Sequence, residues 1–147
     1  MKTRTFEKEI FIESDAATIM DVIVDYSQHP KIHPLINKVE RARDEPAGVQ
    51  RYFITNSLKW GPFKFKTRDR VDITSVTEDT VQIETYQSPG TFVTNLTKIT
   101  SQDGGALLHT TITMRAPDMF FEYAFQQAGA AHAEMLERIK RFVETKA

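Results

Sequence analysis

Cysteine is absent from this chain of 147 residues. The sequence therefore has no thiolate nucleophile, no redox dithiol and no cysteine ligand for zinc or an iron–sulfur cluster. It also offers no disulfide framework of the kind that stabilises small secreted domains. A chain of this length does not need one, because it can bury about 70% of the surface that its unfolded form exposes.

Long apolar runs and an excess of one charge are also lacking. No apolar stretch approaches the roughly 20 residues that a membrane span requires, and residues 1–10 are too charged to form the apolar core of a signal peptide. We therefore expect a cytoplasmic protein without stable membrane insertion. The 19 basic and 20 acidic residues give a formal net charge of -1, which argues against a nucleic-acid partner.

The N-terminal part of the sequence predicts one strand followed by short helices. Apolar and polar side chains alternate over residues 5–13, which is the period of a half-buried strand. Asp15 supplies N-cap chemistry for residues 16–24, whose apolar positions have helical spacing. Pro30 and Pro34 then permit at most one more brief helical turn between them.

The middle of the chain predicts six further strands. Turn-forming residues interrupt it at positions 45–48, 61–62, 78–79, 88–90 and 103–105. The clearest strand covers 63–74 and alternates between two faces, one of which carries Phe63, Phe65, Thr67, Asp69, Val71 and Ile73. The connections are of hairpin length, so the strands should form an antiparallel meander with an apolar face that needs a cover.

A long C-terminal helix is the predicted cover. It should start at Pro117-Asp118 and reach nearly to Ala147, because no other proline interrupts that stretch. At about 100° per residue, its apolar stripe consists of Phe121, Phe125, Ala128, His132, Met135, Leu136, Ile139, Phe142 and Val143. We find no linker or repeat, and we predict a single α+β domain over residues 1–147.

This order of elements resembles the START-like helix-grip fold of the SRPBCC superfamily. Within that group, residues 24–36 are similar to a stretch of the polyketide cyclase/dehydrase and coenzyme Q-binding families, in which an aspartate ending the first helix precedes Tyr-Pro and a second proline. Here Asp25 ends the helix, and three residues separate Tyr26 from Pro30. The glycine-rich loop of the allergen branch and the metal elements of the Rieske oxygenase branch are missing.

The resemblance implies a curved seven-stranded antiparallel sheet wrapped around the C-terminal helix, with two short helices after the first strand. It also implies an apolar cavity between sheet and helix, which the superfamily uses for lipids, quinones, polyketides and hormones. No cofactor or metal is expected. His29 and His33 are four residues apart, but the prolines that follow them prevent the regular helix that would make them a metal pair.

His132 and Asp69 are the two candidate catalytic residues. His132 lies in the apolar stripe beside the small residues of 128–131, which are compatible with a hollow interior, although a well-packed helix with a hydrogen-bonded histidine fits too. Asp69 shares an apolar strand face, so it needs a partner such as His132 or Arg115, a backbone amide or water, or a raised pKa. An Asp–His pair would suit proton abstraction next to a carbonyl.

Two surface features also allow more than one interpretation. Lys64, Lys66, Arg68 and Arg70 point outward and would suit anionic lipid or RNA, but ordinary solvated charges offset by Asp72 and Glu84 explain them better. Residues 60–63 form a hairpin tip, whose Trp60 and Phe63 either gate the cavity or pack on the long helix.

The predicted ligand-binding residues share an inward position on a strand or on the long helix. They are Phe53, Trp60, Phe65, Thr67, Asp69, Ile83, Thr85, Phe92, Leu96, Ile112, Met114, Phe121, Phe125, Ala128 and His132. The inward face is least determined for 49–58 and 91–99, where apolar residues occur on both parities.

Three functions remain open at this point. The first is a binding or carrier protein for a hydrophobic, ring-containing or lipid-like small molecule, present as a monomer or homodimer. The second is a cyclase, aromatase or dehydratase-type enzyme that acts on a polyketone in the same cavity. The third is a module that binds a protein partner through its surface, with the cavity collapsed.

Overall fold

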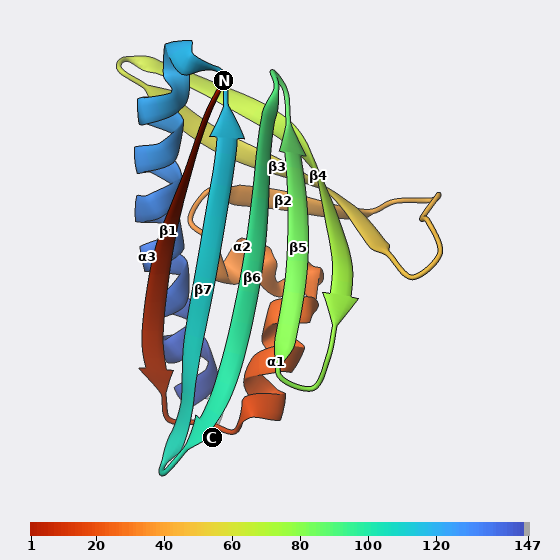
Figure 1. Cartoon of the computed structure of the whole chain (residues 1–147), viewed down its shortest axis with the longest axis vertical. Coiled ribbons are helices and arrows are strands. Elements are labelled where there is room, and N and C mark those ends of the chain that lie inside the picture. Colours follow the sequence, from red (N-terminus) through yellow and green to blue (C-terminus); the bar gives the residue numbers. More distant parts are fainter. Residues whose placement is uncertain (146–147) are drawn as a thin grey trace.

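A curved antiparallel sheet of seven strands forms most of the molecule (Figure 1). The computed structural model describes residues 1–145, and of Trp60 the backbone alone. The strands are β1 (Lys2–Ile12), β2 (Ile36–Arg41), β3 (Gln50–Trp60), β4 (Phe63–Val76), β5 (Thr80–Gln87), β6 (Thr91–Gln102) and β7 (Gly105–Ala116). Their order in the sheet is β1-β7-β6-β5-β4-β3-β2, which confirms the predicted meander.

Short helices follow β1, as the sequence predicts. Helix α1 (Ala16–Val24) begins after Asp15, whose carboxylate accepts a hydrogen bond from the Thr18 amide and satisfies one of the free N–H groups of the first turn. A 3-10 turn at 26–28 leads into the single-turn helix α2 (His29–Ile32). Proline is tolerated in that first turn, because its missing N–H would have no partner there.

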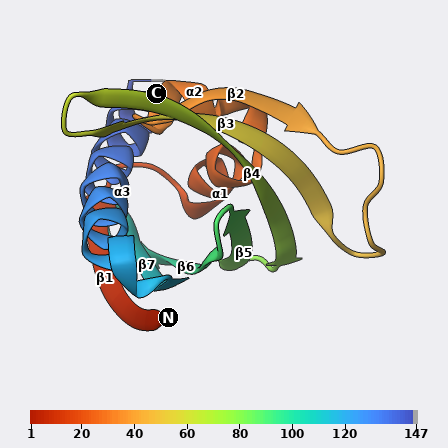
Figure 2. The ribbon, with the colours of Figure 1, turned by 90° about the horizontal axis from the view of Figure 1, so that it is seen from above.

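Helix α3 (Phe121–Glu144) lies along the concave side of the sheet. It begins four residues later than Pro117, since a 3-10 turn at 118–120 precedes it. Figure 2 shows the sheet bending from β1 and β7 beside α3 round to β2 and β3, with α1 and α2 in between. No helix within residues 1–145 is both long and apolar enough to cross a membrane.

The core consists of two separate clusters of buried side chains. The larger one packs the C-terminal half of α3, including Leu136 and Ile139, against α1 and the sheet. The smaller one gathers Met114, Ala116 and Phe121 at the start of α3. The interior between these clusters is walled by side chains but is not filled by them.

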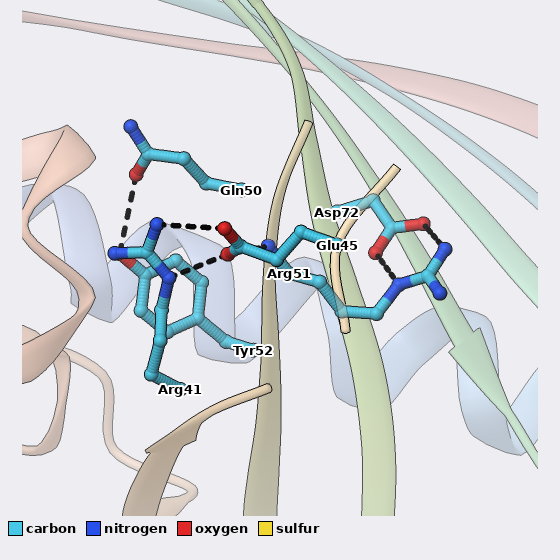
Figure 3. A network of polar contacts seen from close by, with 6 residues as sticks. All are labelled: Arg41, Glu45, Gln50, Arg51, Tyr52 and Asp72. Atoms are coloured by element: carbon cyan, nitrogen blue, oxygen red, sulfur yellow. Dashed lines mark hydrogen bonds and ion pairs between the residues drawn. The ribbon is translucent and has the colours of Figure 1, made fainter. Parts of the chain in front are cut away.

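A polar network holds the connection between β2 and β3 (Figure 3). Glu45 binds the Arg41 guanidinium at 2.5 and 3.1 Å and accepts a hydrogen bond from the Arg51 amide at 2.9 Å. The Arg51 guanidinium binds both oxygens of the buried Asp72, at 2.7 and 3.0 Å. Tyr52 joins the network through its hydroxyl, and none of these residues lines the cavity described below.

The basic stripe on β4 lies on the outer face, where Arg70 forms the expected ion pair with Asp72 at 3.6 Å but Glu84 takes no such part. Glu84 pairs across the strands with Asp72 and not with a basic residue. The Arg70 guanidinium lies 4.1 Å from the centre of the Tyr86 ring. Arg68 lies 4.2 Å from the centre of the Phe53 ring, so cation–π contacts take part of the place of the expected ion pairs.

Candidate functional site

A cavity of about 400 Å³ lies between the concave face of the sheet and α3. Inward-facing side chains of β3 to β7 form one wall, and α3 with α2 forms the other. The cavity exists because α3 presents Ala124, Ala128 and Ala131 at its level, where larger side chains would fill the space. The lining is mainly apolar and carries two polar clusters, one around Asp69 and one around Asn95.

The Asp69 cluster comprises Asn56, Thr67, Asp69 and Gln87, at inward positions of the neighbouring strands β3, β4 and β5. The Asn56 amide donates to Asp69 Oδ2 at 2.6 Å. The Gln87 amide lies 3.4 Å from the same oxygen and donates to the Thr67 hydroxyl at 2.8 Å. Neutral donors therefore surround one oxygen of the carboxylate and fix its position.

Asp69 itself is 4% exposed, and its second oxygen, Oδ1, has no hydrogen-bond partner among the described residues. Burial raises the pKa of this carboxyl to about 6, although hydrogen bonds from Gln87, Thr67 and Asn56 act in the opposite direction. The carboxylate is thus mostly ionised at pH 7, and its Oδ1 keeps an unused capacity to accept a hydrogen bond.

The Asn95 cluster comprises Asn95, Thr97, Thr110 and His132, on β6, β7 and α3. Thr97 donates to Asn95 Oδ1 at 2.7 Å, and Asn95 Nδ2 lies 3.4 Å from His132 Nε2, which accepts in this arrangement. The Thr110 hydroxyl is buried, without a hydrogen-bond partner in the part of the chain that the structure describes.

The Asp–His pair expected from the sequence does not form. Asp69 is bound by neutral amide and hydroxyl groups, while the His132 ring lies beside Asn95 and 6.2 Å from the Phe6 ring. Arg115 is no partner either, because it occupies an exposed outward position on β7. The two candidate catalytic residues both line the cavity, but each belongs to a different polar cluster.

His29 and His33 also line the cavity, which the sequence did not indicate. His29 Nε2 donates to the Ile23 carbonyl at 2.8 Å, and its ring stacks on Tyr26 at 3.8 Å between centres. His33 Nδ1 accepts from the Leu35 amide at 3.1 Å. Each histidine is therefore held by the backbone.

The three histidines of the wall are neutral at pH 7. Burial lowers the pKa of His29 and of His132 to about 4 each, and that of His33 to about 3. The mutual repulsion of protonated rings and the charge of Arg138 lower the value of His33 further. Within residues 1–145, no three His, Asp or Glu side chains are arranged to hold a metal ion.

Nine of the residues predicted from the sequence lie on the cavity wall. They are Phe65, Thr67, Asp69, Ile83, Thr85, Ile112, Met114, Ala128 and His132. The side chain of Trp60 is outside the described part of the structure. The other five predicted residues, Phe53, Phe92, Leu96, Phe121 and Phe125, do not line this cavity.

Three of these five errors come from the parity of β3 and β6. Phe53 lies on the outer face of β3, because the next residue, Ile54, faces the cavity and successive strand residues face opposite sides. The ring of Phe53 contacts the outward Arg68. On β6 the inward positions are Val93, Asn95 and Thr97, so Phe92 packs on Tyr86 outside and Leu96 is 50% exposed. These errors fall in the two stretches, 49–58 and 91–99, in which apolar residues occur on both faces and the inward face was least determined from the sequence.

The two aromatic residues of α3 turn toward β1 instead. Phe121 is fully buried, and Phe125 stacks on it at 5.5 Å between ring centres. The Phe6 ring lies edge-on to Phe125 at 5.4 Å, and the Arg4 guanidinium lies about equally far from both α3 rings, at 5.2 and 5.0 Å. These residues pack the start of α3 against the edge strand β1.

A register argument could have found part of the Asp69 cluster. Gly61, at φ 60°, and Pro62 connect β3 and β4, so Trp60 pairs with Phe63. Counting back from this turn places Asn56 opposite Thr67, on the face that also carries Asp69. The packing of α2 against α3, which brings His29 to the cavity wall, could not be predicted in this way, because no turn or register in the sequence determines it.

The tip of the β3–β4 hairpin reaches across the start of α3 (Figures 1 and 2). The Tyr123 hydroxyl donates to the Lys59 carbonyl and ties the two elements together. Phe63 is 71% exposed and points away from the packed interior, whereas Phe65, two residues along, is both partly exposed and part of the cavity wall.

No protein-family model matches the sequence, and no curated protein matches it. Several solved structures share its fold at low sequence identity. Ara h 8.0201 has a TM-score of 0.69 at 18% identity, covering 98% of this chain and 99% of that chain. The Zhui aromatase/cyclase from Streptomyces sp. R1128 has a TM-score of 0.71 at 16% identity, covering 97% of this chain and 94% of that chain.

The protein TTHA0849 from Thermus thermophilus has a TM-score of 0.78 at 10% identity, with 98% of this chain and 99% of that chain covered. At such low sequence identity, the structural similarity establishes the architecture alone, so the function must be argued from the site itself. The chain has the helix-grip fold that the order of its elements predicted, with the long helix held against a seven-stranded antiparallel sheet.

Proposed function

Starting from the helix-grip fold, we propose that this protein binds a hydrophobic small molecule in the cavity between the sheet and α3, as a binding or carrier protein. The observation that carries the proposal is the cavity of about 400 Å³ with its mainly apolar wall. Pockets for small organic ligands generally have about 300–1,000 Å³, an apolar lining and a few convergent polar groups. The third possibility, a surface-binding module with a collapsed interior, does not account for this space.

The two polar clusters would orient such a ligand. Asp69 Oδ1 and the Thr110 hydroxyl are buried polar atoms without partners among the described residues, and they lie on different strands, β4 and β7. Buried polar atoms usually have hydrogen-bond partners, and leaving one without costs about 1–3 kcal/mol. A ligand that binds either atom would recover this free energy, so we expect an apolar body with at least one polar group.

The test compares variants that fill the cavity with variants that do not. Ala128 faces the cavity from α3, whereas Ala133 is exposed on the same helix. We expect Ala128→Phe to weaken binding of the apolar dye Nile red at least tenfold, while Ala133→Phe leaves it unchanged. Native mass spectrometry of the freshly purified protein would show whether a natural ligand is retained. Equal dye binding by both variants would contradict a ligand site in the cavity.

A cyclase or dehydratase-type activity is the second candidate, favoured by the position of Asp69. A carboxyl on the cavity wall with a pKa of about 6 suits general acid–base catalysis near neutral pH, and one of its oxygens has no hydrogen-bond partner among the described residues. Asp69 would act without His132 as its direct partner. If a bound polyketone is turned over, Asp69→Asn should lower kcat far more than KM, and unchanged turnover would rule out this role.

A further inference from the structure

We propose that the cavity selects a basic ligand, namely an amine attached to an apolar body, whose ammonium group binds the free oxygen of Asp69. This inference rests on the proposed function and specifies the chemical class of the ligand. It follows from the charges of the cavity wall, from the hydrogen bonds of Asp69 and from the positions of the nearest cations.

The charge of the wall is negative and is not balanced by the protein. Asp69 is the one carboxylate among the described lining residues, and that lining includes no lysine or arginine. The three histidines of the wall are neutral at pH 7, as their lowered pKa values indicate. An ionised carboxylate is costly to bury without a cation, so a cationic group on the ligand would offset this cost.

The hydrogen bonds of Asp69 leave a defined place for a cation. Asn56 and Gln87 both approach Oδ2, whereas Oδ1 has no partner among the described residues. Asn56 and Gln87 also donate to the Thr67 hydroxyl, whose own hydrogen can then point to the carboxylate. All three neighbours are neutral, and they hold the carboxylate in one orientation without neutralising it.

The nearest basic side chains on β4 cannot supply the missing charge. Arg68 and Arg70 flank Asp69 in sequence, so the alternation of the strand places them on the opposite face. There they lie over the rings of Phe53 and Tyr86, at 4.2 and 4.1 Å from the ring centres. A cation that reaches Asp69 must therefore come from within the cavity, as part of the ligand.

An ammonium group suits this site better than a hydroxyl group of the same shape. Either group can donate a hydrogen bond to Oδ1, but only the ammonium balances the negative charge in a wall of low polarity. A ligand carboxylate would be repelled. The preference among an amine, an alcohol and an acid on one carbon skeleton is therefore a direct measure of the proposed recognition.

Isothermal titration calorimetry with 4-phenylbutylamine, 4-phenylbutanol and 4-phenylbutanoate at pH 7.5 tests this order. We expect the amine to bind the wild-type protein at least tenfold more tightly than the alcohol, and the acid to bind most weakly. Asp69→Asn should reduce the preference for the amine to less than about twofold. Glu84→Gln, which removes a carboxylate from the outer face of the sheet, should leave the preference unchanged.

A pH series on the wild-type protein gives the same test without a variant. Protonation of Asp69 near pH 6 should abolish the amine preference between pH 7.5 and 5, while alcohol binding stays constant. The other titratable groups of the wall are Tyr26, His29, His33, Tyr123 and His132. They stay neutral over this range, because burial lowers the pKa of the histidines and raises that of the tyrosines.

Equal affinity for amine and alcohol in the wild-type protein would overturn the inference, as would a uniform loss of both affinities in Asp69→Asn. Those results would leave the cavity as a site for neutral ligands, because the proposed function is judged separately by Nile red and the Ala128→Phe variant. If neither probe nor dye binds, the proposed function fails together with the inference.

Discussion

Acid should destabilise this protein through the buried histidines of its cavity wall, and His29 provides the clearest test. Its pKa is about 4 in the folded protein against an ordinary value of 6.5. The unfolded chain therefore binds the proton first as the pH falls below 6.5, and stability is lost down to about pH 4. Between pH 7 and pH 5 this linkage amounts to about 2 kcal/mol.

The other ionisable groups of the wall set the total. His132 and His33 have similarly lowered pKa values and contribute about 2 kcal/mol each over the same interval. Asp69 acts in the opposite direction, because its raised pKa lets the folded protein bind a proton at a higher pH than the unfolded chain does. This protonation stabilises the folded state by about 1 kcal/mol between pH 7 and pH 5. The net loss of about 5 kcal/mol is a large part of the stability of a typical domain.

Urea unfolding followed by circular dichroism at pH 7, 6 and 5 measures this loss. His29→Gln keeps an N–H donor for the Ile23 carbonyl but cannot titrate, so its loss between pH 7 and 5 should be about 2 kcal/mol smaller than that of the wild type. His109→Gln is the matched control, since this ring lies on the outer side of β7 beside Glu7 and Glu9. Parallel pH dependences of wild type and His29→Gln would refute the reasoning.

Two further changes test the packing of the fold by the same urea assay. Arg51→Met removes the bidentate partner of the buried Asp72 carboxylate and leaves it only the longer contact with Arg70 at 3.6 Å, so it should lower the free energy of unfolding by about 3 kcal/mol. Removing the exposed Lys38 should cost less than about 1 kcal/mol. Gly105→Ala would press a methyl group into the Ile12 carbonyl and should cost more than the roughly 1 kcal/mol of an ordinary backbone mismatch. Unchanged stability in either variant would contradict the contacts described.

Local patterns were sufficient to predict the order of the helices and strands, whereas the curved sheet around the long helix was implied by the resemblance to the helix-grip fold. The N-cap at Asp15 and the apolar spacing after it gave the bounds of α1, and the turn residues divided the middle of the chain into the observed strands. These features act over a few residues and depend little on the rest of the molecule. The start of α3 was placed too early, because a 3-10 turn carries the same N-terminal signals as an α-helix.

The cavity wall was predictable only in part, because it depends on strand parity and on helix docking. On β4 the alternation is regular, and the inward positions Phe65, Thr67 and Asp69 were predicted. On β6 the large apolar residues Phe92 and Leu96 lie outside, while the polar Asn95 lies inside. A rule that turns apolar residues inward fails there, since a polar cluster within the cavity wall reverses the usual preference at these positions.

The acid response and the ligand preference are linked through the order in which the wall titrates. As the pH falls, Asp69 is protonated near pH 6, whereas the native histidines take up protons only near pH 4. The cavity therefore loses its negative charge while its imidazoles are still neutral, and a basic ligand should dissociate before the wall gains any positive charge. Bound amine stabilises the folded state by mass action, so its release removes stability in the same pH interval in which His29 begins to favour the unfolded chain. The unfolding midpoint of the amine-bound protein should consequently fall more steeply with pH than that of the free protein, and it should converge on the free value by pH 5.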